Sequence, residues 1–60
     1  MTFNNAKIGN KYRSRVNTIA TDCRYEIIKM NKTTCHVRLW ENNKPTDTIY
    51  KGVRYSVLTT

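Results

Sequence analysis

The feature that most constrains this chain is the alternation of apolar and polar residues within short segments. Residues 34–41 read Thr-Cys-His-Val-Arg-Leu-Trp-Glu, and residues 23–30 read Cys-Arg-Tyr-Glu-Ile-Ile-Lys-Met; both are rich in strand formers. A period of two is typical of a strand with one face in the core and the other in solvent. No amphipathic helix or heptad repeat competes with this pattern. The sequence therefore predicts an all-β fold.

Five segments are expected to form strands after a polar lead-in of residues 1–10. The lead-in ends at the turn signal Gly9-Asn10 and holds at most one helical turn, within residues 2–9. The strands are expected at residues 11–20, 23–30, 34–41, 46–51 and 53–58. Residues 41–47 contain two asparagines and Pro45, which predicts the most exposed loop, and Gly52 is expected at a sharp corner or a bulge.

The alternation also assigns faces and a register. The residues expected in the core are Cys23, Tyr25, Ile27, Cys35, Val37, Leu39, Val53, Tyr55 and Val57. For the second and third strands to face the core together, opposed residues must have an even index sum, so an odd number of residues connects them. A three-residue loop with Asn31 or Lys32 in the left-handed region fits this requirement. Tyr12 and Tyr50 are left free either to stack on a ligand or to pack.

Sixty residues predict a single domain, 1–60, whose residues 11–58 form a small barrel. Closing a strongly bent sheet shields edges that otherwise pair with other chains. An SH3-like barrel is favoured over a partly open OB-like barrel, because the OB-fold generally needs more residues. The polar lead-in, the long central hairpin and the short last strand after a tight turn resemble SH3-like barrels of the KOW and Tudor type, over about residues 10–58. The small size and basic charge also resemble many small phage-encoded proteins.

The charge balance indicates the class of partner. Eleven Lys and Arg against four Asp and Glu give a net charge of +7, which attracts polyanions such as nucleic acid, an anionic membrane surface or an acidic protein. No apolar run approaches the ~20 residues of a membrane span, and the first residues lack the apolar region of a secretory signal. We therefore expect a cytoplasmic protein that does not use a membrane as its partner.

Two groups of residues are candidates for a binding surface. Lys11, Arg13 and Arg15 alternate, so they project from one face of the first strand, as suits phosphates along a backbone. The outer face of the central hairpin is expected to hold Arg24, Glu26, Ile28, Met30, His36, Arg38 and Trp40. An indole beside arginines offers a surface on which bases stack. The alternative is that strong bending folds Trp40 into a second side of the core.

The leading hypothesis is a non-enzymatic module that binds nucleic acid. The residues expected to contact phosphates are Lys11, Arg13, Arg15, Arg24, Arg38 and Arg54, and those expected to stack on bases are Trp40 and Tyr50. The alternative is a small phage-type inhibitor or adaptor that docks on an acidic surface of a host or partner protein through Ile28, Met30 and Trp40. A homodimer that completes its sheet is compatible with either hypothesis.

Neither catalysis, a metal nor a cofactor is expected. The single histidine, His36, has no nucleophile nearby in the pattern, and Glu26 is more simply its charge partner, or that of Arg38. Cys23 and Cys35 are expected roughly 13 Å apart along the strands, too far for a disulfide or a shared zinc ion. They are interpreted as small buried hydrophobic residues.

Overall fold

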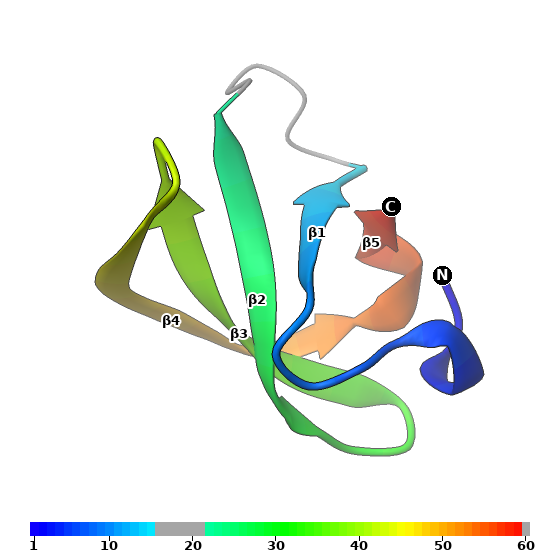
Figure 1. Ribbon diagram of the computed structural model, residues 1–60. Coiled ribbons are helices and arrows are strands. Elements are labelled where there is room, and N and C mark those ends of the chain that lie inside the picture. The colour runs from blue at the N-terminus through cyan, green and yellow to red at the C-terminus, as the bar shows by residue number, and fades with distance from the viewer. Residues whose placement is uncertain (16–21, 60) are drawn as a thin grey trace.

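The computed structural model describes residues 1–15 and 22–59, which form one antiparallel sheet of five strands (Figure 1). The strands are β1 (Lys11–Ser14), β2 (Cys23–Met30), β3 (Thr34–Glu41), β4 (Lys44–Arg54) and β5 (Leu58–Thr59). Their order across the sheet is β4-β3-β2-β1-β5, so β4 and β5 are its two edges. The all-β prediction is confirmed. The sheet is bent but is not closed into a barrel, because the two edge strands do not pair.

Two short 3₁₀ helices complete the described residues. The first, η1 (Phe3–Asn5), is the single helical turn expected in the lead-in. The second, η2 (Tyr55–Val57), turns the chain from β4 back to β5, which pairs with β1. Within the described part of the chain, no helix is long and apolar enough to cross a membrane.

The predicted strand bounds hold in the centre of the sheet and fail at its ends. β2 and β3 have the predicted bounds, and β1 begins at Lys11 as expected. The expected end of the first strand, at residue 20, lies outside the described residues. The prediction of separate strands at residues 46–51 and 53–58 is wrong, because β4 continues through Gly52. The chain leaves the strand only at Tyr55, where η2 begins.

Gly52 bends β4 without ending it. Cys35 pairs with Val53 and Val37 pairs with Tyr50, so Lys51 and Gly52 together lie opposite one residue of β3. Such a bulge accommodates an extra residue on one strand and increases the local bend. Gly52 has a φ of +69°, in the left-handed region that glycine adopts without a steric cost. The expected bulge is present.

The connection between β3 and β4 is shorter than the expected loop of residues 41–47. Asn42 and Asn43 both have positive φ, 51° and 63°, and Glu41 pairs with Lys44. Two left-handed residues form the type I′ turn that matches the twist of a hairpin. Pro45 then lies within β4, where its lack of an N–H is tolerated because β4 is an edge strand.

A second bulge follows in β4 at residues 46–48, which lie opposite Leu39. The Thr46 hydroxyl donates to the Leu39 carbonyl at 2.7 Å and accepts the backbone N–H of Thr48 at 3.2 Å. The side chain thus replaces hydrogen bonds that the interrupted strand pairing no longer makes.

The hairpin of β2 and β3 has the predicted even register in its centre, where Ile27 pairs with Val37. A bulge at Ile28 then shifts the pairing, so that Met30 lies opposite Cys35. The expected left-handed conformation of Asn31 or Lys32 is wrong, since neither has positive φ. The bulge supplies the extra residue that the even register required. The loop between β2 and β3 therefore needs no left-handed residue.

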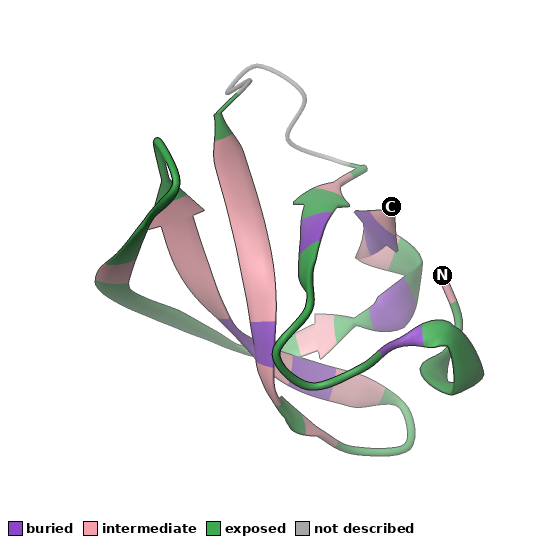
Figure 2. Cartoon of the chain, in the orientation of Figure 1, coloured by how far each residue is buried: buried purple, intermediate pink, exposed green. Residues whose placement is uncertain are grey.

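The core lies on the inner face of the sheet, the face of Tyr12, Ile27 and Val37, and Figure 2 marks its buried segments along the chain. The buried residues are Ala6, Tyr12, Ile27, Cys35, Val37, Tyr55 and Leu58. Four of them were expected, and the other five expected residues are half-buried because the sheet leaves this face partly open. Ala6 and Leu58, which were not expected, come from the two ends of the chain. The Met1 ammonium donates to the Leu58 carbonyl at 3.2 Å, which ties these ends together.

Candidate nucleic-acid interface

The register gathers basic side chains of three strands on the outer face of the sheet. One row of paired residues crosses four strands and consists of Lys11, Glu26, Arg38 and Ile49. The neighbouring row consists of Arg24, Trp40 and Pro45. Tyr12 is buried between Lys11 and Arg13, so strand alternation points both of these cations outward, and both are exposed.

Trp40 lies at the centre of this outer face with two charged partners. Its indole N–H donates to a Glu26 carboxylate oxygen at 2.8 Å. The Lys11 ammonium sits over the ring, with Nζ 3.7 Å from the ring centroid. This cation–π contact is worth about 0.5–1 kcal/mol at an exposed site. Trp40 is half-buried on the outer face, so the alternative of an indole in a second core is not what the structure has.

The arginines of β2 and β3 are anchored to the backbone. A terminal nitrogen of Arg38 donates to the Thr46 carbonyl at 3.0 Å, and one of Arg24 donates to the Cys23 carbonyl at 2.8 Å. A guanidinium has five N–H donors, so the bond to Thr46 orients that of Arg38 and leaves other donors for an anion. Glu26 lies opposite Arg38 as expected, yet its carboxylate accepts the Trp40 indole.

The other predicted cations lie at the margins of this face. Arg15 follows β1, is exposed, and its backbone N–H donates to the Val57 carbonyl at 2.6 Å. Arg54 pairs with Thr34, next to the inward pair of Cys35 and Val53. It therefore shares the outer face but lies four residues along β3 from Arg38, or roughly 13 Å.

Tyr50, which like Trp40 was predicted to stack on bases, lies on the opposite face of the sheet from Trp40. It pairs with the buried Val37, and its ring centroid is 6.1 Å from that of Tyr25 with an angle of 56° between the rings. Its side chain is 45% exposed. Simple alternation counted back from Val53 would place Tyr50 on the outer face, and the bulge at residues 51–52 reverses this because it adds one residue. The bulge at residues 46–48 adds two residues and leaves the alternation unchanged.

The apolar patch expected from Ile28, Met30 and Trp40 is divided between the two faces. Met30 pairs with Cys35 and packs against the core, so its expected outer position is wrong. The bulge at Ile28 is the cause, because one extra residue reverses the alternation that follows it. Ile28 and Trp40 are half-buried.

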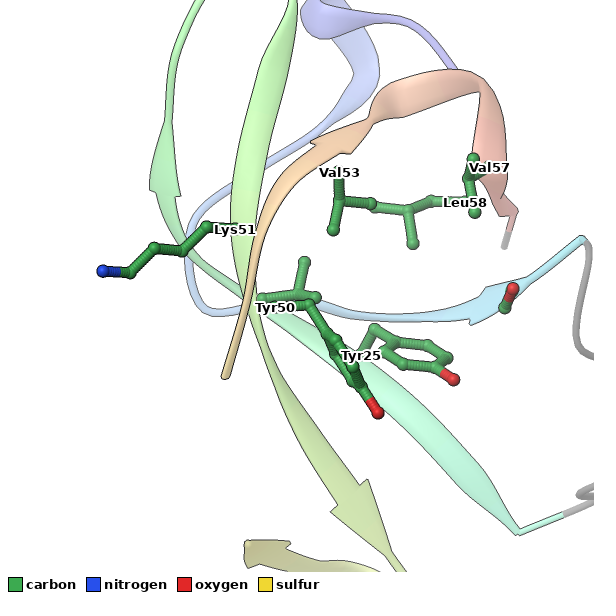
Figure 3. Close-up of a pocket in the computed structure, with 8 residues that line it drawn as sticks. Tyr25, Tyr50, Lys51, Val53, Val57 and Leu58 are labelled. Atoms are coloured by element: carbon green, nitrogen blue, oxygen red, sulfur yellow. The ribbon is translucent and has the colours of Figure 1, made fainter. Parts of the chain in front are cut away.

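The inner face carries a pocket that the sequence analysis did not anticipate (Figure 3). Its volume is about 380 Å³. The residues that line it are Ser14, Tyr25, Val37, Tyr50, Lys51, Val53, Val57 and Leu58. They come from both edges of the sheet and from the strands between them, so the pocket occupies the gap that closure into a barrel would fill. No pattern of neighbouring residues predicts this pocket, because it depends on how the folded sheet places its two edge strands, β4 and β5.

The two cysteines are free thiols in different surroundings. Cys23 is half-buried opposite Glu41, whereas Cys35 is fully buried and its thiol donates to the Val53 carbonyl at 3.5 Å. Burial raises the pKa of the Cys35 thiol. Burial also raises the pKa of Tyr55, with repulsion from Cys35 as the second cause, and its hydroxyl donates to the Asn31 carbonyl. In residues 1–15 and 22–59, no three His, Cys, Asp or Glu side chains are close enough to share a metal ion.

These two groups predict that stability falls in alkali. A raised pKa in the folded state means that the unfolded chain loses its protons first, so the stabilisation is complete below the ordinary pKa and decreases as pH rises. We expect the free energy of unfolding to fall from about pH 9, where an unfolded thiol ionises, and further above pH 10 as unfolded Tyr55 ionises. Urea titrations between pH 7 and pH 10.5 measure this effect. A Cys35→Ala variant should lose the first part of the decrease, and an unchanged decrease in that variant would contradict the assignment.

The chain was also compared with known proteins. Comparison with protein-family models, with curated proteins and with solved structures found no match. The function is therefore inferred from the residues and geometry of the outer face and the inner pocket.

Proposed function

We propose that the protein is a non-enzymatic module that binds nucleic acid, with phosphates held on the outer face of its sheet. The observation that carries this proposal is the cluster of Lys11, Arg13, Arg24 and Arg38 around Trp40. Glu26 is the one acidic residue in the two rows that cross this face, and its carboxylate accepts the indole N–H. The net charge of this surface is therefore positive.

The proposed mode of binding depends mainly on charge. Phosphate contacts release condensed counterions and carry little sequence information, so affinity should be salt-dependent and weakly specific. Anchoring of Arg38 and Arg24 to backbone carbonyls reduces the conformational entropy that these side chains lose on binding. Trp40 is less available, because a base that stacks on the ring face under Lys11 has to displace the ammonium.

We propose in addition that the sheet is an open form of an SH3-like fold. The order β4-β3-β2-β1-β5 supports this assignment, since four successive antiparallel strands are followed by a short strand that returns to β1. The turn at η2 and the short strand β5 that follows it match the tight turn and short last strand of small barrels of the KOW and Tudor type. The OB-like alternative has less support, because the chain is shorter than that fold generally needs.

A salt titration tests the function directly. With five phosphate contacts, from the cluster around Trp40 and from Arg15 at its margin, the logarithm of the affinity for a labelled single strand should fall with the logarithm of the salt concentration with a slope of about −3.5. Fluorescence anisotropy of a labelled oligonucleotide measures it. An oligonucleotide with an uncharged methylphosphonate backbone is the control and should bind far more weakly. Equal binding of the two oligonucleotides, or no dependence on salt, would reject the proposal.

The second candidate function is that of a small protein ligand for an acidic surface. It is favoured by Ile49, which is 42% exposed and lies beside Arg38 on the outer face, so that an apolar contact adjoins a cation. Pull-down from lysate after nuclease treatment separates the candidates. Retention of a specific protein without nucleic acid would support this second function, provided that the Ile49→Asp variant no longer retains it.

A further inference from the structure

The pocket on the inner face has the size and the lining of a small-ligand site. Its volume of about 380 Å³ falls within the 300–1,000 Å³ that is usual for such sites. Four apolar residues form much of the wall, namely Val37, Val53, Val57 and Leu58. Polar atoms come from Tyr25, Tyr50 and Ser14. Apolar walls with a few hydroxyls suit a flat ring that has hydrogen-bonding groups at its edge.

Two tyrosines supply the aromatic surface of the pocket. The rings of Tyr25 and Tyr50 are tilted by 56°, with their centroids 6.1 Å apart, so they do not stack flat on each other. Tyr50 remains 45% exposed, in contrast to Trp40, which is half-buried and covered by an ammonium group. In Figure 3 the two tyrosines lie side by side, while the Lys51 side chain extends away from the pocket. The structure thus has an accessible aromatic ring here rather than on the outer face.

We propose that this pocket receives an unpaired nucleobase of the strand whose phosphates the outer face binds, a proposal that rests on the proposed function. The base stacks on Tyr50, and the hydroxyl of Tyr25 bonds to its edge. Stacking on an aromatic side chain is sequence-tolerant, because every base has a π-face. The charge of the chain, +7, favours a polyanion over an apolar peptide as the occupant.

The position of β4 lets one strand of nucleic acid contact the outer face with its phosphates and the pocket with a base. β4 is an edge of the sheet, so a bound strand can pass around it from one face to the other. Ile49 pairs with Arg38 on the outer face, and the next residue, Tyr50, pairs with Val37 on the inner face. The Lys51 ammonium extends from this same edge, where it can meet the backbone of the passing strand (Figure 3).

This arrangement requires single-stranded nucleic acid. A base within a duplex is paired and stacked, so moving it into the pocket first requires that pairing and stacking to be broken. The protein should therefore bind a single strand more tightly than a duplex of the same length, even though a duplex carries more phosphates. The phosphate contacts of the outer face alone predict no such preference.

The test compares an oligonucleotide with one in which every nucleotide is abasic, so that the phosphates remain and all bases are removed. The intact strand should bind about tenfold more tightly to the unaltered protein, as expected for one stacked base. Tyr50→Leu should abolish this ratio, and Tyr50→Phe, which keeps the ring, should preserve it. Phe3→Leu is the matched control, because Phe3 is 43% exposed and does not line the pocket.

The outcomes separate this inference from the proposed function. If neither oligonucleotide binds, both proposals fail together. If both bind equally, the phosphate contacts stand and the base pocket is overturned. A ratio that persists in Tyr50→Leu would also overturn it, because bases would then be bound elsewhere, with Trp40 the first candidate. The comparison on the unaltered protein needs no variant, so it holds even if Tyr50→Leu fails to fold.

Discussion

Reversing the charges of Arg13 and Arg15 together is expected to lower the affinity for a single-stranded oligonucleotide roughly 50-fold near 50 mM salt. Both side chains are exposed and belong to the same stretch of the chain, at β1 and just beyond it. The loss of two phosphate contacts should also make the salt slope less steep by about 1.4. Fluorescence anisotropy at several salt concentrations measures both quantities in the Arg13→Glu, Arg15→Glu variant.

A control with the same change of charge separates position from net charge. Lys32→Glu together with Lys44→Glu lowers the net charge by the same four units, from +7 to +3. Lys32 lies in the loop between β2 and β3, and Lys44 pairs with Glu41 at the turn between β3 and β4. Neither lysine belongs to the two rows of the outer face. We expect this control to lose only a few-fold in affinity, through weaker long-range attraction. Equal losses in the two double variants would show that total charge, rather than the outer face, governs binding.

The second large effect concerns stability. Ile27→Ala should lower the free energy of unfolding by about 2–5 kcal/mol, because it removes a fully buried side chain and leaves a cavity. A domain of this length has a total of about 3–9 kcal/mol, so the variant should be largely unfolded or close to it. Ile27 is at the centre of the hairpin opposite Val37, and its backbone also bonds with Gly9 and Asn10. Urea denaturation followed by circular dichroism measures the change.

Ile49→Ala is the matched control for Ile27→Ala. The same groups are removed, but Ile49 is 42% exposed on the outer face, so the loss should stay below about 1 kcal/mol. A similar loss of stability in both variants would contradict the burial described here. A small loss in Ile27→Ala would contradict it as well.

Much of the fold follows from local patterns. Alternation in residues 23–30 and 34–41 gives the central strands with their bounds, and it gives the pairing of Ile27 with Val37. A one-residue slip would expose the whole apolar set, so the register is fixed by the sequence itself. The outward direction of Lys11 and Arg13 follows from the same argument, with Tyr12 buried between them.

The errors occur where a bulge interrupts this alternation. Met30 was expected outside and packs against the core, and the loop that follows lacks the expected left-handed residue. Each bulge depends on hydrogen bonds between strands, such as that from the Thr46 hydroxyl to the Leu39 carbonyl. A pattern read along one strand does not contain these bonds.

The sequence by itself determined that this chain is a β protein with a basic surface, because strand alternation and net charge are properties of local residues. Only the tertiary structure decided that the sheet stays open, with Tyr50 and Tyr25 beside a pocket between β4 and the segment Val57–Leu58. Bulges bend the strands, and contacts between distant residues, such as Met1 with Leu58, hold the two ends of the chain together. Those contacts exist only once the whole chain has folded.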